Sequence, residues 1–152
     1  MAKIAFFPGS FDPITKGHED IVKRAIPMFD KIIVALGKNT SKNSMFSLKT
    51  RLEWVENTFK ECSNVKVMAY EGLTINACKI HSAQYILRGI RNTIDFEYEK
   101  NIAVINQNMA PDIETIYLNT NPELAAISST IVREIIKNQG KAEPFLASGV
   151  CL

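Results

Sequence analysis

Five short apolar runs alternate with five stretches of helical periodicity, and this alternation limits the possible folds more than any other feature of the sequence. The apolar runs cover residues 3–7, 31–36, 64–70, 84–87 and 113–118, and each is followed by apolar residues at amphipathic-helix spacing. Strands that alternate with helices form a parallel sheet with right-handed crossovers. The sequence therefore predicts an α/β fold built on a parallel sheet.

The chain shows no internal repeat, low-complexity tract or linker, so we expect residues 1–152 to form a single domain. We expect a Rossmann-like five-stranded parallel sheet in the order 3-2-1-4-5, with helices on both faces. In such sheets ligands bind outside the carboxyl ends of the strands, where the strand order reverses. The segments that follow the strands are therefore the place to search for a site.

Composition argues against several classes of function. The net charge is only +2, so bulk charge gives no argument for binding nucleic acid. No apolar run reaches the length of about 18 residues that a membrane span requires, so no membrane is expected. Cys62, Cys78 and Cys151 lack the spacing of a zinc site or a disulfide framework, which favours a cytoplasmic location and no protein-bound metal.

Residues 4–18 (IAFFPGSFDPITKGH) hold the clearest functional signal. A buried strand ends in a turn rich in proline and glycine, and this turn leads into a helix. The first turn of a helix offers unpaired N–H groups and a partial positive charge, so it can bind a phosphate. Gly17 permits close approach of a ligand, and His18 lies in that first turn. A lone surface histidine is the plainer interpretation, but the turn before it favours a phosphate site.

Basic and hydroxyl side chains gather in the other segments that follow strands. Residues 88–92 (RGIRN) carry Arg88 and Arg91, whose guanidinium groups suit bidentate phosphate binding. Residues 127–133 (ISSTIVR) begin a helix whose hydroxyls and N–H groups suit a second phosphate, although they also suit plain capping. Lys42 lies in the loop after the second strand, where a lysine is more often simply solvated. Together these groups predict a site for a polyanion.

The familiar phosphate-binding motifs are missing. The sequence has no GxGxxG after the first strand and no GxxxxGK[ST], which disfavours an ordinary dinucleotide-binding domain and a Walker-type ATPase. It also has no GxSxG elbow, which disfavours a hydrolase.

The motifs that are present resemble those of the nucleotidylyltransferase superfamily. PGSFDPITKGH at residues 8–18 is similar to its FDPxxxGH signature, and ISSTIVR at residues 127–133 is similar to its ISSTxxR motif. RGIRNTIDFEYE at residues 88–99 and MFSLKTR at residues 45–51 resemble segments of the bacterial phosphopantetheine adenylyltransferases. The resemblance covers nearly the whole chain at matching spacing.

The resemblance implies a step of coenzyme A biosynthesis in which ATP and 4′-phosphopantetheine give dephospho-coenzyme A and pyrophosphate. It implies direct in-line attack of the phosphopantetheine phosphate on the α-phosphorus of ATP, without a covalent intermediate. A phosphate monoester is already ionised near neutral pH, so positioning and charge stabilisation suffice. The resemblance also implies Mg²⁺ bound with ATP, mainly through phosphates and water, and a cytoplasmic homohexamer.

Site residues follow from the matching positions. The resemblance implies catalytic roles for His18, Lys42 and Arg91. It implies ATP binding by Ser10, Phe11, His18, Gly89, Ile90, Arg91, Glu99, Leu124, Ala125, Ala126, Ile127, Ser128, Ser129 and Thr130. It implies phosphopantetheine binding by Ser10, Lys42, Thr74, Arg88 and Asn106. Ser10 and Thr74 depart from the family, which often has threonine and methionine at these positions.

Two alternatives remain open from the sequence. A cytidylyltransferase or a nicotinamide-nucleotide adenylyltransferase shares the first and last motifs, although FEYE at residues 96–99 favours phosphopantetheine as substrate. A non-catalytic nucleotide-binding module on the same fold is a different class, but such a module need not keep both His18 and the ISST helix. The nucleotides consumed and the effect of replacing His18 distinguish these possibilities.

Overall fold

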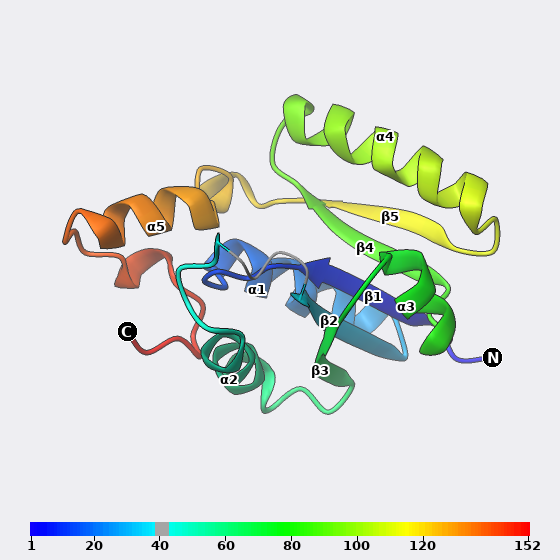
Figure 1. Ribbon diagram of the computed structural model, residues 1–152, viewed down its shortest axis with the longest axis horizontal. Helices are drawn as coiled ribbons and strands as arrows, with labels where there is room; N and C mark the ends of the chain where they lie inside the picture. Colours follow the sequence, from blue (N-terminus) through cyan, green and yellow to red (C-terminus); the bar gives the residue numbers. More distant parts are fainter. Residues whose placement is uncertain (39–42) are drawn as a thin grey trace.

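Strands and helices alternate along the chain, as Figure 1 shows for residues 1–38 and 43–152, which the structure, a computed structural model, describes. The strands are β1 (Ile4–Gly9), β2 (Lys31–Gly37), β3 (Val65–Tyr70), β4 (Tyr85–Ile90) and β5 (Glu114–Asn119). The helices are α1 (Lys16–Ala25), α2 (Leu48–Phe59), α3 (Thr74–Ile80), α4 (Thr93–Met109) and α5 (Ser129–Lys137). Short 3₁₀ turns occupy Ile26–Met28, Pro122–Leu124 and Glu143–Phe145.

All of these strands join one parallel sheet in the order β3-β2-β1-β4-β5. The predicted α/β fold and its strand order are therefore confirmed. The chain moves outward from β1 to β3 and then returns to β4 on the other side of β1, so the strand order reverses there. The carboxyl ends of β1 and β4 consequently flank the position at which ligands bind in such sheets.

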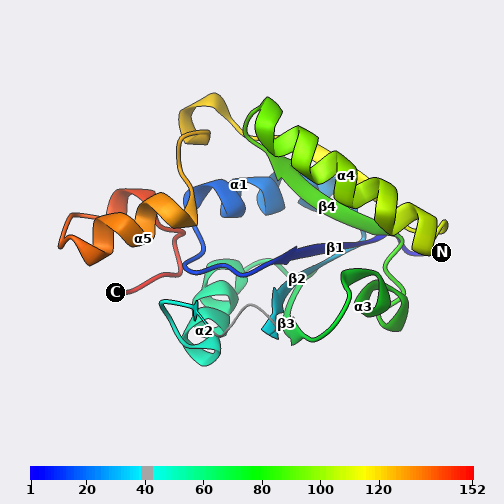
Figure 2. The same cartoon turned by 45° about the horizontal axis from the view of Figure 1, so that its top comes forward.

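Alternating side chains give the sheet two apolar faces. On one face Phe7 and Val34 belong to a core shared with α1 and α2, and on the other Phe6 and Ile33 belong to a core shared with α3. Helix α4 lies along β4 at the outside of the molecule (Figure 2), and Glu99 is its one buried residue. No helix in the described part of the chain combines the length and the hydropathy of a membrane span.

Two strands extend further than the sequence predicts. β1 continues through Pro8 and Gly9, because these residues stay in register with Ala35 and Leu36 of β2. β4 continues through residues 88–90, which the sequence predicts as a loop, because β5 pairs with them up to its own end. The prediction is wrong there since proline and glycine suggest strand ends, whereas pairing with a neighbouring strand keeps them extended. The first arginine of the RGIR segment therefore stands on a strand.

Capping side chains set the starts of three helices. Ser47 and Ser128 are the N-caps of α2 and α5, and each hydroxyl accepts a bond from a backbone N–H three residues on. Asn92 caps α4. Its side-chain oxygen accepts a bond from the backbone N–H of Asp95 at 2.9 Å.

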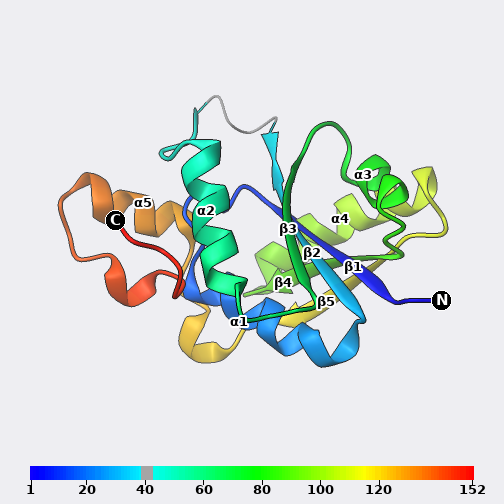
Figure 3. The ribbon, with the colours of Figure 1, turned by 90° about the horizontal axis from the view of Figure 1, so that it is seen from below.

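The C-terminal segment, residues 141–152, carries little pattern in the sequence but has a definite course. It returns from α5 and passes between α5 and α2 (Figure 3). Leu146 packs with Val132 of α5, and the N–H of Gly149 donates to Oγ1 of Thr58 in α2 at 3.2 Å. The end of the chain thus connects two helices that are far apart in the sequence.

Candidate active site

A cavity of about 310 Å³ opens at the carboxyl ends of β1 and β4, where the strand order reverses. The starts of α1 and α5 both border it, so the positive ends of two helix dipoles meet at one space. Its lining residues are Phe7, Pro8, Gly9, Ser10, Phe11, Thr15, Gly17, His18, Ile21, Arg88, Gly89, Arg91, Asp95, Glu99, Thr120, Ile127, Ser128, Ser129 and Thr130. This arrangement suits a polyanionic ligand.

A second cavity of about 370 Å³ adjoins the first, beside α3 and α4. It mixes apolar, hydroxyl and amide groups, since it is lined by Pro8, Gly9, Ser10, Gly37, Tyr70, Thr74, Ile86, Arg88, Tyr98, Glu99, Ile102, Ala103, Asn106 and Thr115. The residues common to both cavities are Pro8, Gly9, Ser10, Arg88 and Glu99. Two ligands bound in the two cavities would therefore meet at these shared residues.

His18 stands in the first turn of α1, and a neighbour fixes which ring nitrogen carries the proton. The backbone N–H of Thr15, the N-cap of α1, donates to His18 Nδ1 at 3.0 Å. Nδ1 is therefore an acceptor, and the proton of the neutral ring lies on Nε2. None of the described residues forms a hydrogen bond with Nε2, so this N–H is available to a ligand in the cavity that His18 lines.

The surroundings of His18 keep its ring neutral. The ring of Phe11 lies edge-on to it with a centroid separation of 5.1 Å. Burial, and then the positive charges of Arg88 and Arg91, lower the pKa of His18 from 6.5 to about 4. Near pH 7 the ring can therefore donate a hydrogen bond to an anionic ligand, but it does not carry a positive charge.

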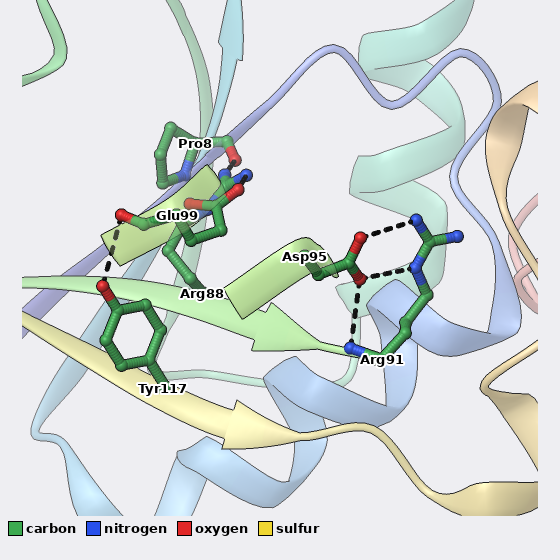
Figure 4. A network of polar contacts seen from close by, with 6 residues as sticks. All are labelled: Pro8, Arg88, Arg91, Asp95, Glu99 and Tyr117. Atoms are coloured by element: carbon green, nitrogen blue, oxygen red, sulfur yellow. Dashed lines mark hydrogen bonds and ion pairs between the residues drawn. The ribbon is translucent and has the colours of Figure 1, made fainter. Parts of the chain in front are cut away.

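Glu99 holds Arg88 in a bidentate ion pair at the boundary of the two cavities (Figure 4). Nε and Nη2 of Arg88 donate to the Glu99 carboxylate at 2.8 and 2.6 Å, and Nη1 donates to the carbonyl of Pro8 at 2.7 Å. Tyr117 Oη donates to the backbone carbonyl of Glu99 at 3.3 Å. Three of the five guanidinium N–H groups are thus used within the described residues, and two remain for a ligand. Both carboxylate oxygens of Glu99 face Arg88, so Glu99 orients the arginine.

Asp95 holds Arg91 in a similar way (Figure 4). Nε and Nη2 of Arg91 donate to the carboxylate at 2.9 and 3.2 Å, and the backbone N–H of Arg91 donates to it at 3.1 Å. The hydrogen bond from the Arg91 side chain lowers the pKa of Asp95 below its ordinary value, although burial opposes this shift. Sequence reasoning missed Asp95, and its four-residue spacing from Arg91 is the signal that points to the pair.

The hydroxyls at the start of α5 are partly used by the protein itself. Ser129 Oγ donates to the carbonyl of Pro13 at 2.8 Å, so its proton is not available to a ligand. Ser128 Oγ accepts from the backbone of α5, and Thr130 Oγ1 accepts from Arg133. Among residues 1–38 and 43–152, neither hydroxyl donates a hydrogen bond, so both protons can be donated to a ligand. A phosphate at this helix start would bind to these two hydroxyls and to backbone N–H groups.

Two charged residues that sequence reasoning missed hold the loop after β1. The buried carboxylate of Asp12 accepts bonds from the backbone N–H groups of Met45 and Phe46 at 2.8 and 3.0 Å. Arg51 is fully buried and donates to the carbonyls of Ser10 and Phe46 at 2.6 and 3.0 Å. Both residues lie within motifs quoted above, so these motifs also contribute to the scaffold of the candidate site.

The chain matches known proteins over nearly its whole length. Residues 6–135 match the cytidylyltransferase-like family. The phosphopantetheine adenylyltransferase of Cytophaga hutchinsonii is 48% identical over 146 residues, which cover 96% of this chain and 97% of that protein. The enzyme of the same name from Flavobacterium psychrophilum is 54% identical over 136 residues, which cover 90% of this chain and 89% of that protein. The chain belongs to the phosphopantetheine adenylyltransferases.

Solved structures share the fold at lower sequence identity. A bifunctional NMN adenylyltransferase/ADP ribose pyrophosphatase from Francisella tularensis superposes with a TM-score of 0.74 at 17% identity, covering 99% of this chain and 46% of that chain. A putative nicotinate-nucleotide adenylyltransferase from Vibrio parahaemolyticus superposes with a TM-score of 0.66 at 19% identity, covering 96% of this chain and 94% of that chain. This chain spans less than half of the bifunctional protein, and both likenesses show the fold alone.

The two cavities bring together most of the residues that the family pattern assigns to substrates. The residues assigned to ATP that line the first cavity are Ser10, Phe11, His18, Gly89, Arg91, Glu99, Ile127, Ser128, Ser129 and Thr130. Ile90, Leu124, Ala125 and Ala126 are assigned to ATP but are not among its lining residues. The residues assigned to phosphopantetheine that line the second cavity are Ser10, Thr74, Arg88 and Asn106. Lys42 lies outside the described residues.

The part of this phosphopantetheine adenylyltransferase that the structure describes has no group of three or more His, Cys, Asp or Glu side chains placed to hold a metal ion. Asp95 and Glu99 are the carboxylates that line the first cavity, and both are bonded to arginines. These residues do not fit a protein cage for a cation.

Proposed function

We propose that the chain transfers the adenylyl group of ATP to 4′-phosphopantetheine in a single in-line displacement at the boundary of the two cavities. An oxygen of the phosphopantetheine phosphate forms a bond to the α-phosphorus of ATP, while the bond from that phosphorus to the bridging oxygen of pyrophosphate breaks. The products are dephospho-coenzyme A and pyrophosphate. No covalent enzyme intermediate forms, and no strong general base is needed because a phosphate monoester is already ionised near pH 7.

The observation that carries this proposal is that the two cavities share Ser10 and Arg88. ATP in the first cavity would place its phosphates between the starts of α1 and α5. The second cavity offers both apolar and amide groups, such as Ile102 and Asn106, which suit the carbon and amide groups of a pantetheine arm. The phosphate at the end of that arm would then lie beside the α-phosphate of ATP, as in-line attack requires.

Each polar group of the site has a role in this proposal. His18 donates from Nε2 to an oxygen of the α-phosphate, where negative charge increases in the transition state. Arg88, oriented by Glu99, holds the phosphopantetheine phosphate with its two remaining N–H groups. Arg91 and the start of α5 bind the β- and γ-phosphates and stabilise the departing pyrophosphate. Lys42, from the family pattern, is a further ligand for the incoming phosphate.

Mg²⁺ enters the proposal together with ATP, held by phosphate oxygens and water rather than by protein carboxylates. When bound, it supplies positive charge that neutralises the phosphates. Support comes from the paired state of the arginines: Arg88 with Glu99 and Arg91 with Asp95 sum to zero charge. A polyanion in this cavity therefore gains from a cation that it brings with it.

The decisive measurement is pyrophosphate release with defined pairs of substrates. With ATP, Mg²⁺ and 4′-phosphopantetheine, we expect pyrophosphate and dephospho-coenzyme A in equal amounts. ATP with nicotinamide mononucleotide, and CTP with glycerol phosphate, should give no turnover. If the protein turned over ATP with nicotinamide mononucleotide, or CTP with glycerol phosphate, but not ATP with 4′-phosphopantetheine, the proposal would be overturned in favour of the corresponding nucleotidylyltransferase.

Replacing His18 by alanine separates catalysis from simple nucleotide binding. Loss of a transition-state hydrogen bond costs about 3–4 kcal/mol, so kcat should fall by roughly 10²–10³-fold. In His18→Ala, the affinity for ATP measured by calorimetry and the unfolding temperature should both stay close to the wild-type values. His81→Ala is the matched control, because His81 lines neither cavity. Unchanged turnover in His18→Ala would contradict the assigned role and favour a nucleotide-binding module.

We also propose that the protein is a homohexamer in the cytoplasm. The apolar surface of α4 supports assembly, because Ile94, Tyr98 and Ile105 are strongly exposed on it. All cysteines of the chain are free thiols, which suits a reducing compartment. Light scattering should give six times the mass of the chain, and a monomer at micromolar concentration would overturn the hexamer.

A further inference from the structure

The C-terminal segment passes directly behind the residues that lead into α1. The N–H of Ala147 donates to the carbonyl of Ile14 at 3.3 Å, and Leu146 pairs with Thr15 in an antiparallel bridge. All four residues are buried. The contact is therefore part of the protein interior, and it includes the residue whose N–H donates to the ring of His18.

A second contact joins the same segment to α1 itself. The N–H and the hydroxyl of Ser148 donate to Oε2 and Oε1 of Glu19 at 2.8 and 2.7 Å. Lys23 donates to the same carboxylate at 2.6 Å from the solvent side. Burial acts to raise the pKa of Glu19, but the hydrogen bonds from Lys23 and Ser148 outweigh it and lower the pKa. Glu19 is therefore a buried carboxylate that remains charged near pH 7.

Gly149 seats the segment against α2. Its N–H donates to Oγ1 of Thr58 at 3.2 Å. A Cβ added at Gly149 would lie 2.2 Å from the backbone nitrogen of Thr58 and 2.6 Å from the carbonyl oxygen of Trp54. No side chain fits there without displacing helix backbone, so the segment has a fixed register between α1 and α2.

These contacts lie on both sides of His18 in the sequence. Before it, the N–H of Thr15 donates to His18 Nδ1 at 3.0 Å. After it, the N–H of Glu19 donates a hydrogen bond to the carbonyl of Thr15 at 3.1 Å, which completes the first turn of α1. Leu146 and Ser148 hold Thr15 and Glu19 from behind. A shift of the first helical turn would move the ring of His18, and a misplacement of about 1 Å can cost a large factor in rate.

We propose that Ser148 is a positioning residue for adenylyl transfer: through Glu19 it holds the first turn of α1 so that Nε2–H of His18 points to the α-phosphate. The inference rests on the proposed function, because it requires His18 to stabilise that phosphate. Ser148 lines neither cavity, so its removal should change kcat and leave substrate binding almost unaffected.

The test compares Ser148→Ala with two matched variants. Ser148→Thr keeps the hydroxyl, and Lys23→Met removes the other partner of the Glu19 carboxylate. In Ser148→Ala we expect kcat to fall about tenfold while KM for each substrate stays within about twofold. Ser148→Thr and Lys23→Met should keep kcat within about twofold of wild type. An unchanged kcat in Ser148→Ala, with or without a lower unfolding temperature, would overturn the proposal.

Nitrogen NMR of the His18 ring gives a second readout that needs no turnover. Wild type should show the Nε2–H tautomer, and Ser148→Ala should show a mixture of tautomers, whereas Lys23→Met should resemble wild type. If wild type releases no pyrophosphate, the proposed function fails. The His18 tautomers of wild type and Ser148→Ala can still be compared, and this comparison decides whether Ser148 positions His18. If Ser148→Ala does not fold, Glu19→Gln, which has the same shape and one acceptor oxygen fewer, is measured instead. Loss of folding in both variants would overturn the proposal, since the contact would then serve stability alone.

Discussion

Replacing Glu99 by glutamine tests how the boundary of the two cavities is organised. The carboxylate accepts bonds of 2.8 and 2.6 Å from Arg88. Glutamine has the same shape, but its NH₂ group cannot accept, so one hydrogen bond is lost and the other loses its ionic partner. A hydrogen bond to a charged group contributes about 1.5–3 kcal/mol. The Glu99 and Arg88 side chains are 11% and 30% exposed, so water replaces part of the loss.

We therefore expect the free energy of unfolding to fall by about 2 kcal/mol, near the lower end of that range. For a chain of this size the unfolding temperature should fall by about 4–8 °C. The kcat should fall because Arg88 loses its fixed orientation. ATP binding should not weaken, because the cavity loses a negative charge and becomes more favourable for a polyanion. Calorimetric unfolding, pyrophosphate release and ATP titration measure these quantities.

The matched control is Glu97→Gln, because Glu97 lies on the same helix and pairs with Lys100 at the surface at 3.4 Å. It should change none of the measured quantities. The family resemblance implies instead that Glu99 contacts ATP. Glu99→Gln could instead weaken ATP binding by about tenfold, or 1.4 kcal/mol, and leave the free energy of unfolding unchanged. That result would support a direct contact between Glu99 and ATP and would refute the orienting role of Glu99.

Other predictions concern His18, Arg91 and Gly149. The pKa of His18 is about 4 in the folded protein against an ordinary 6.5, so the unfolded state binds its proton first as the pH falls. The urea concentration at the unfolding midpoint should therefore decrease as the pH is lowered from 6.5 towards 4, and it should decrease more steeply in wild type than in His18→Gln. Parallel curves for the two proteins would contradict a neutral His18 ring. Arg91→Ala should weaken ATP binding more than phosphopantetheine binding, and separate titrations with the reverse order would refute this division. Gly149→Ala should lower the free energy of unfolding by about 1–3 kcal/mol through overpacking against α2, and an unchanged denaturation midpoint would contradict the fixed register.

The sequence alone determined the fold class and the edge of the sheet that carries the site. Strands that alternate with helices form a parallel sheet, and the carboxyl ends of its strands lie at one edge. His18 could therefore be placed beside Arg88 and Arg91, although His18 follows the first predicted strand and the arginines follow the fourth. The family motifs were readable for a related reason, since each is a short continuous stretch with fixed spacing.

The sequence could not show how the charged groups of the site are paired. The pairing of Arg88 with Glu99 needs β4 to continue through the arginine and α4 to lie beside it. Arg51, which reads as an ordinary helix residue, is buried beneath the loop after β1. The prediction of a loop at residues 88–90 is wrong because pairing with a neighbouring strand overrides the local preference of glycine.

Only the tertiary structure decided the chemical state of His18 and the contacts of the C-terminal segment. The pKa of the ring depends on burial and on two arginines, and its tautomer depends on the N–H of Thr15. Ser148 reaches Glu19 across a separation of 129 residues. Periodicity and sterics act between near neighbours in the chain, so they encode helices, strands and turns. Protonation and hydrogen bonding depend instead on which atoms distant segments bring within about 3 Å of one another, and the folded chain alone sets those distances.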